Sequence, residues 1–260
     1  MPVRITLLGR MAVHGNGTEI TRATKGNSGQ LLAYLALHPH GVTTEEAMET
    51  LWPERGPGQA PRPLYGAADR TRALLQEHLG TVPATGTVPY ILAGSGTWRL
   101  DPARITTDLD AFTTAFNTTR ATGPRHRRAV CERALALYTG DLCTGMDHPW
   151  LEGFRTDLRD RALALLDDLI TTAPDPQIAI AHLEQALALD PYNEPLHLRL
   201  AELHARRGST DAVARLKERL TRTLADIDEK PSPDTTRSFT QLLQHRPAPM
   251  SARTTASPRR

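Results

Sequence analysis

The sequence predicts a mainly α-helical protein in which a small α+β region precedes an all-α region built from helical repeats. Residues 132–137 (Glu-Arg-Ala-Leu-Ala-Leu) are nearly repeated at residues 184–189 (Glu-Gln-Ala-Leu-Ala-Leu), and residues 179–183 are echoed 33 positions later at 212–216. An offset of about 34 with small residues at fixed helical positions is typical of tetratricopeptide-type helix pairs. Such pairs bury their apolar faces by stacking on neighbours, so they build scaffolds for partner proteins.

Short strands and three helices are predicted for the first part of the chain. Residues 3–13 alternate in polarity and break at Gly9, which predicts two strands, and Asn16-Gly17 predicts a tight turn before a brief strand at residues 19–20. Helix signals follow, with Ser28 as the first expected cap and Thr43 or Thr44 as the second. The three helices are expected at residues 29–37, 45–51 and 63–78.

A hairpin is expected after the third helix. Residues 88–92 and 97–100 have strand character and bracket the turn sequence Gly94-Ser95-Gly96. Strands, three helices and a hairpin are the order of a winged helix-turn-helix, in which the third helix enters the major groove and the hairpin forms the wing. Residues 1–100 are therefore predicted to form a winged helix-turn-helix.

The remainder of the chain is expected to be all-α. Proline and glycine separate apolar-periodic segments, which predicts a tetratricopeptide-like domain at residues 101–245. Its helices are expected at residues 108–120, 125–138, 150–172, 176–189, 193–207, 210–226 and 233–244. Residues 246–260 are rich in Ser, Thr and Arg with few apolar residues, which predicts a disordered basic tail.

Composition narrows the class of protein. Hydrophobic residues make up 39% and charged residues 23% of the 260 positions, as in ordinary globular proteins. No apolar run is long enough to span a membrane and no export signal is present, so a cytoplasmic protein without membrane contact is expected. Cys131 and Cys143 do not form a disulfide framework and are expected to be buried and reduced.

Several sequence segments resemble those of a known family. Residues 31–39 (Leu-Leu-Ala-Tyr-Leu-Ala-Leu-His-Pro), Gly41-Val42 and Leu51-Trp52-Pro53 resemble the winged helix of the SARP-type antibiotic-regulatory activators of actinobacteria. The second half resembles their bacterial transcriptional activator domain (BTAD). This second resemblance rests on four sequence segments: residues 134–141, Trp150-Leu151-Glu152 with Arg155, residues 190–197 and Pro231-Ser232-Pro233.

The resemblance implies a transcriptional regulator, an activator, that binds promoter DNA and contacts RNA polymerase. Its double-stranded DNA partner would meet the winged helix, while RNA polymerase or another protein, or a second copy in a homodimer, would meet the helical-repeat domain. The chain departs from the family pattern at residues 73–77 (Ala-Leu-Leu-Gln-Glu), where the family has an arginine-rich run, and at residues 27–30 (Asn-Ser-Gly-Gln). These departures affect DNA affinity rather than the fold.

Five residues are candidates for DNA contact. On the third predicted helix, Leu64, Ala67 or Ala68, Thr71, Leu75 and Leu79 form the expected buried stripe. Arginines near the opposite face can contact phosphates or guanine edges, or can simply be solvated. Arg72 lies so close to the stripe that its side chain can instead run along the apolar surface and keep its charged end in water, without reaching DNA. Arg99 falls at the wing position, where it either contacts a phosphate or packs across strands, and Trp98 is expected to pack the wing. The DNA-binding candidates are Arg62, Tyr65, Arg70, Arg72 and Arg99.

Weak basicity counts against a broad DNA-binding surface. Residues 1–100 carry nine Lys or Arg against seven Asp or Glu, and Asp69 and Glu77 on the third helix would face the phosphate backbone. The alternative hypothesis is therefore a protein-interaction adaptor whose winged helix does not bind DNA. Salt-dependent binding to duplex DNA separates the two hypotheses.

No catalytic pattern stands out. Asp141, Asp147 and His148 lack a further ligand at regular metal-site spacing, and the sequence has no Gly-x-x-x-x-Gly-Lys phosphate loop. His182, His197 and His204 fall on separate predicted helices, away from any nucleophile motif. Neither an enzyme, a metal nor a cofactor is expected, and the spacing of Trp150, Phe154, Leu158 and Leu165 predicts core packing.

Overall fold

A computed structural model describes residues 3–56, 58–79 and 90–244. The chain divides into two compact units, Met1–Leu165 and Leu166–Arg260, and the division falls within one long helix. Within the described residues no helix is both long and apolar enough to cross a membrane. The expected disordered tail at residues 246–260 lies outside the described residues.

The first unit contains a four-stranded sheet of order β3-β2-β1-β7. β1 (Val3–Thr6), β2 (Ala12–Gly15) and β3 (Thr18–Glu19) are antiparallel neighbours. Asn16 and Gly17 both have positive φ, +50° and +80°, which matches the expected tight turn between β2 and β3. β7 (Ile105–Thr107) was not expected from the sequence, and it pairs parallel to β1.

The winged helix-turn-helix is confirmed. It contains η1 (Thr21–Thr24), α1 (Gly26–Leu37), α2 (Thr44–Leu51) and α3 (Arg62–Leu79). A second sheet of order β4-β6-β5 joins them, with β4 (Val42–Thr43), β5 (Ile91–Gly94) and β6 (Thr97–Leu100). β5 and β6 form the expected hairpin with Gly94 paired to Thr97, although residues 88 and 89 of its expected first strand lie outside the described residues.

The cap of α2 is confirmed and that of α1 is wrong. Thr43 accepts a hydrogen bond from the Glu46 backbone N–H, and the Glu46 carboxylate accepts one from the Thr43 N–H, which completes a capping box. Ser28, expected to cap α1, is instead buried inside that helix, whose N-cap residue is Lys25. The helix begins early because η1 packs on its first turn, where a Cβ at Gly29 would lie only 2.1 Å from the Thr24 carbonyl oxygen.

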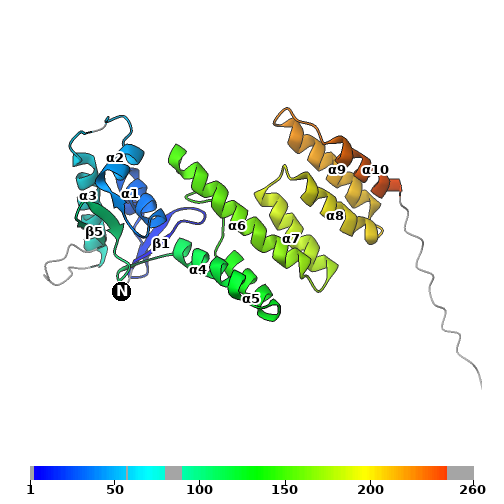
Figure 1. Cartoon of the computed structure of the whole chain (residues 1–260), viewed down its shortest axis with the longest axis horizontal. Coiled ribbons are helices and arrows are strands. Elements are labelled where there is room, and N and C mark those ends of the chain that lie inside the picture. Colours follow the sequence, from blue (N-terminus) through cyan, green and yellow to red (C-terminus); the bar gives the residue numbers. More distant parts are fainter. Residues whose placement is uncertain (1–2, 57, 80–89, 245–260) are drawn as a thin grey trace, which may run out of the picture. The chain divides into compact units, whose positions relative to one another are not determined.

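Helices make up most of the described residues from 108 to 244, as predicted. They are α4 (Asp108–Ala121), α5 (Pro124–Leu135), α6 (Glu152–Thr171), α7 (Pro176–Leu189), α8 (Glu194–Arg206), α9 (Thr210–Ala225) and α10 (Pro233–Gln244). The short η2 (Pro149–Leu151) leads into α6. In the second unit α7 packs on α8, α8 on α9, and α10 on both α8 and α9 (Figure 1). The sequence echo at residues 179–183 and 212–216 lies at corresponding positions in α7 and α9.

The boundary between the two predicted domains, at residues 100 and 101, stays a prediction. β7 and α4 follow that point in the chain, yet both contact β1 within the first unit. Leu158 and Leu165 are buried as expected, whereas Trp150 and Phe154 are half-buried. Trp150 packs edge-on against Tyr34 of α1, with 5.4 Å between ring centroids. Cys131 and Cys143 are both buried, as expected, and burial raises the pKa of Cys143 to about 12.

Candidate nucleic-acid interface

Helix α3 has one buried face and one exposed face. At 3.6 residues per turn its apolar positions fall on one side, which packs on α1, α2 and β2. Leu79, at the end of the expected stripe, is half-buried against Gly15 of β2. The buried residues are Leu64, Ala67, Ala68, Thr71, Arg72 and Leu75, and the exposed ones are Arg62, Tyr65, Asp69, Arg70, Ala73, Glu77 and His78.

Arg62 and Arg70 are the exposed arginines of α3. Within the described part of the chain, neither side chain has an ion pair or a hydrogen bond. Tyr65 lies on the same helix with half of its surface exposed, and its ring packs edge-on against Trp98 at 5.0 Å between centroids. Of the five predicted DNA-contacting residues, Arg62, Arg70 and Tyr65 are therefore exposed on α3.

Arg72 has a different environment from the other candidates. It is 9% exposed, it donates a 2.8 Å hydrogen bond to the backbone carbonyl of Ile91, and it forms a 3.0 Å ion pair with Asp69. Its guanidinium also lies 5.9 Å from the centre of the Trp98 ring. These contacts hold Arg72 between α3 and the β5–β6 wing, so we leave it out of the proposed DNA-contacting surface.

The wing presents Arg99, and His40 lies beside it in the loop between α1 and β4. Trp98 is buried and donates a 3.0 Å hydrogen bond from Nε1 to the Thr44 hydroxyl, which confirms that it packs the wing against α2. Arg99 follows on β6, opposite Leu92 of β5, and is exposed with no ion pair among the described residues. It lines a shallow hollow of about 410 Å³ together with His40, which the sequence analysis did not single out.

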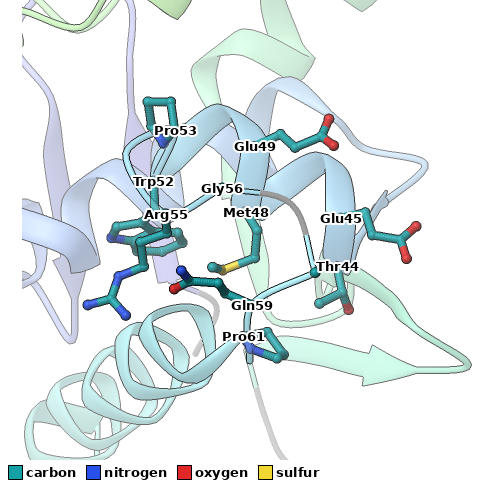
Figure 2. A pocket seen from close by; sticks show the side chains of 11 residues that line it. Thr44, Glu45, Met48, Glu49, Trp52, Pro53, Arg55, Gly56, Gln59 and Pro61 are labelled. Atoms are coloured by element: carbon teal, nitrogen blue, oxygen red, sulfur yellow. The ribbon is translucent and has the colours of Figure 1, made fainter.

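A second hollow, of about 570 Å³, lies beside α2 and the chain that leads to α3. Figure 2 shows Met48 and Gln59 pointing toward one another across it, with Glu45 and Glu49 directed outward. Part of its wall is formed by residues that flank Pro57, which lies outside the described residues, and we assign no ligand to it.

Within the first unit, backbone hydrogen bonds join the chain around Gly9 to residues 141–144, which precede α6. The Leu7 carbonyl accepts a 2.7 Å hydrogen bond from the Cys143 N–H, and the Gly9 carbonyl accepts one of 2.8 Å from the Thr144 N–H. Arg155 of α6 holds the same segment by donating to three of its carbonyls. These belong to Leu142 at 3.0 Å, Cys143 at 3.3 Å and Met146 at 2.6 Å.

Asp108 at the start of α4 completes this junction. Its carboxylate accepts hydrogen bonds from the backbone N–H groups of Leu7 at 2.7 Å and Leu8 at 3.0 Å. Burial raises the pKa of the Asp108 carboxyl, and these hydrogen bonds oppose the rise. No local sequence pattern marks Asp108, because its partners lie about a hundred positions away along the chain.

The remaining titratable candidates have structural contacts. Asp141 accepts a hydrogen bond from Tyr138 and forms a 2.6 Å ion pair with Arg159. No group of three or more metal-ligating side chains occurs within residues 3–56, 58–79 and 90–244. His197 is fully buried in α8 and bonded through Nδ1 to the Asn193 carbonyl, whereas His182 and His204 are half-buried on α7 and α8.

Comparison with known proteins agrees with this architecture. Residues 107–243 match the family model of the bacterial transcriptional activator domain. The chain belongs to this family. Over 202 residues it is 26% identical to the regulatory protein AfsR of Streptomyces coelicolor, which covers 77% of this chain and 20% of AfsR. The expected resemblance to SARP-type regulators is confirmed.

A solved structure shares the fold of almost the whole chain. Mycobacterium tuberculosis EmbR, solved in complex with a low-affinity phosphopeptide, superposes with a TM-score of 0.63 at 23% sequence identity. The match covers 95% of this chain and 66% of the EmbR chain. The chain therefore spans two thirds of EmbR and one fifth of AfsR. The BTAD match begins at the last residue of β7 and ends inside α10.

Proposed function

We propose that this protein is a cytoplasmic, DNA-binding transcriptional regulator that acts as an activator. Helix α3 docks in the major groove and the β5–β6 wing rests on the neighbouring backbone, as in other winged helix-turn-helix proteins. One observation carries the proposal. The outward face of α3 presents Arg62 and Arg70, and the wing presents Arg99, all exposed and without a carboxylate partner among the described residues.

The chemistry of these side chains suits DNA. A guanidinium binds phosphate oxygens and can donate two parallel hydrogen bonds to a guanine edge. Arg62 lies at the first turn of α3, the part of a recognition helix that contacts base edges. Tyr65 lies one turn further along, beside the wing, where its ring can contact the sugar–phosphate backbone.

The helical-repeat region supplies the protein contacts in this proposal. Stacked helix pairs of this kind present surfaces to other proteins rather than a catalytic pocket. We propose that α4–α10 contact RNA polymerase or another component of the transcription machinery, or form a homodimer on repeated DNA sites. Membership of the BTAD family supports this role.

The test is binding to the DNA upstream of the protein's own gene. With Arg70 and Arg99 each neutralising one phosphate, the logarithm of the association constant should fall with the logarithm of salt concentration with a slope of about −1.8. Replacing Arg62 and Arg70 together by Glu should abolish the footprint. Arg215→Glu combined with Arg222→Glu is the control matched in charge, because both are exposed arginines of α9 in the second unit. A footprint that survives the double charge reversal would contradict the assignment of α3.

One observation favours the adaptor alternative. Asp69 and Glu77 are exposed acids on the same helix and would repel a phosphate backbone. An adaptor would show no duplex binding at low salt, and the charge reversal would leave its protein contacts unchanged. The salt titration of the unaltered chain therefore separates the two functions before any variant is made.

A further inference from the structure

Asp69 occupies an unexpected place for an acid on a helix proposed to face DNA. Its side chain is 72% exposed. At 100° per residue, Asp69 lies within about 20° of Arg62 around the axis of α3, and Ala73 lies on the other side of Arg62. Asp69 therefore projects from the centre of the outward face rather than from its edge.

The Asp69 carboxylate is fixed in place by Arg72. Arg72 Nη1 lies 3.0 Å from Oδ1 of Asp69, and the guanidinium is itself held by the Ile91 carbonyl at 2.8 Å and by the Trp98 ring at 5.9 Å. Only one carboxylate oxygen takes part in this pair. The other, Oδ2, has no partner among the described residues.

The arrangement leaves a donor of Arg72 unused. Nε of Arg72 is buried without a hydrogen-bond partner in the described part of the chain. A buried guanidinium placed only for stability would be expected to satisfy its donors. Its contacts instead join three elements at the candidate interface: the outward face of α3, the wing strand β5, and the wing tryptophan on β6.

A fixed, exposed carboxylate has a specific complement in the major groove. It only accepts hydrogen bonds, and the donors on base edges there are the amino groups of cytosine and adenine, of which cytosine N4 is the usual partner of an acidic side chain. Guanine and thymine present acceptors at the corresponding edge and would be repelled. The charge that weakens attraction to phosphates therefore gives discrimination between bases.

We propose that Asp69 is a specificity-determining residue that accepts a hydrogen bond from a cytosine amino group, and that Arg72 is the positioning residue that aims it. This inference rests on the proposed function, since it requires α3 to enter the major groove. It gives Arg72 a role in recognition without contact to DNA.

Selection of duplexes from a random pool by the full-length chain tests the inference. The unaltered protein should require cytosine at one base pair with about five- to tenfold preference. Asp69→Ala should lose the preference at that base pair alone. Asp69→Asn should move it toward adenine, because an amide can pair with both N6 and N7 of adenine while still accepting from Arg72.

Two further variants separate recognition from packing and charge. Arg72→Lys replaces the planar fork, whose Nη1 bonds Asp69 and whose Nη2 bonds Ile91, by one ammonium nitrogen that cannot reproduce this geometry, so the cytosine preference should weaken at the same base pair. Glu77→Ala removes the other exposed acid of α3, which has no partner among the described residues. It should strengthen binding to all duplexes alike and leave the base preference unchanged. Thermal unfolding of each variant checks that the winged helix remains folded.

The outcomes are distinguishable. If the Asp69 variants stay folded and keep every base preference, with affinity changed equally for all duplexes, Asp69 is only the counter-ion of Arg72 and the inference is overturned. If the unaltered chain binds no duplex at low salt, the proposed function itself fails and the inference falls with it. A change confined to one base pair supports both.

Discussion

The junction at Asp108 makes a strong prediction about stability. Among the described residues, the Asp108 carboxylate is the only acceptor for the buried backbone N–H groups of Leu7 and Leu8, at 2.7 and 3.0 Å, and replacing Asp108 by Ala removes it. A buried donor left without an acceptor costs about 1–3 kcal/mol, so two of them would cost about 2–6 kcal/mol. Burial of the carboxylate is itself unfavourable, as its raised pKa indicates, and this reduces the net loss. We expect Asp108→Ala to lower the free energy of unfolding of the first unit by about 2–4 kcal/mol.

Tryptophan fluorescence can measure this loss in the first unit alone. The three tryptophans of the chain are Trp52, Trp98 and Trp150, and all lie in the first unit. Urea unfolding followed by fluorescence therefore reports that unit, while far-ultraviolet circular dichroism reports the helices of both. Asp108→Asn should recover at most half of the loss, because its amide oxygen can accept from one N–H while its NH₂ group faces the other donor.

Asp110→Ala is the matched control. Asp110 is an exposed acid in the same first turn of α4, so its removal should cost no more than about 0.3–1 kcal/mol through the helix dipole. A loss for Asp108→Ala no larger than that of Asp110→Ala would refute the reasoning. It would mean that the Leu7 and Leu8 N–H groups find other acceptors at little cost.

Two more predictions concern a buried histidine and a helix cap. Burial lowers the pKa of His197, so the unfolded chain binds a proton at a higher pH than the folded chain does. The second unit should therefore lose stability as pH falls below the ordinary histidine pKa. In His197→Leu only the dependence due to His204, whose pKa is also lowered by burial, should remain. Circular dichroism during heating measures the unfolding of both proteins, and an unchanged pH dependence in the variant would contradict the assignment. Thr43→Ala should destabilise the first unit by about 1 kcal/mol through loss of the α2 capping box, whereas Thr43→Ser should not. Unfolding followed by tryptophan fluorescence measures the stability of each variant. Equal free energies of unfolding for the two variants would argue against the cap.

Local patterns explain why so many elements were predicted correctly. The Asn16-Gly17 turn, the Thr43 cap and the 3.6-residue periodicity of α3 depend on contacts between residues a few positions apart. Such contacts are formed by the same residues that carry the pattern. The buried stripe of α3 from Leu64 to Leu75 could therefore be predicted from spacing alone.

Errors occurred where distant parts of the chain meet. β7 is three residues long and forms only because β1 offers a parallel edge to Ile105 and its neighbours. Trp150 has helical spacing with core residues, yet its ring packs on Tyr34, more than a hundred positions earlier in the sequence. No local pattern carries these contacts.

The sequence by itself determined the order of helices and strands, the repeat in the second half, and which face of α3 turns outward. Only the tertiary structure decided which arginines remain exposed. Spacing along α3 puts Arg72 close to the buried stripe, but only the fold brings the Ile91 carbonyl of β5 within reach of its guanidinium. A long arginine side chain can extend into solvent or fold back onto a neighbouring acceptor, and the fold determines whether that acceptor is present.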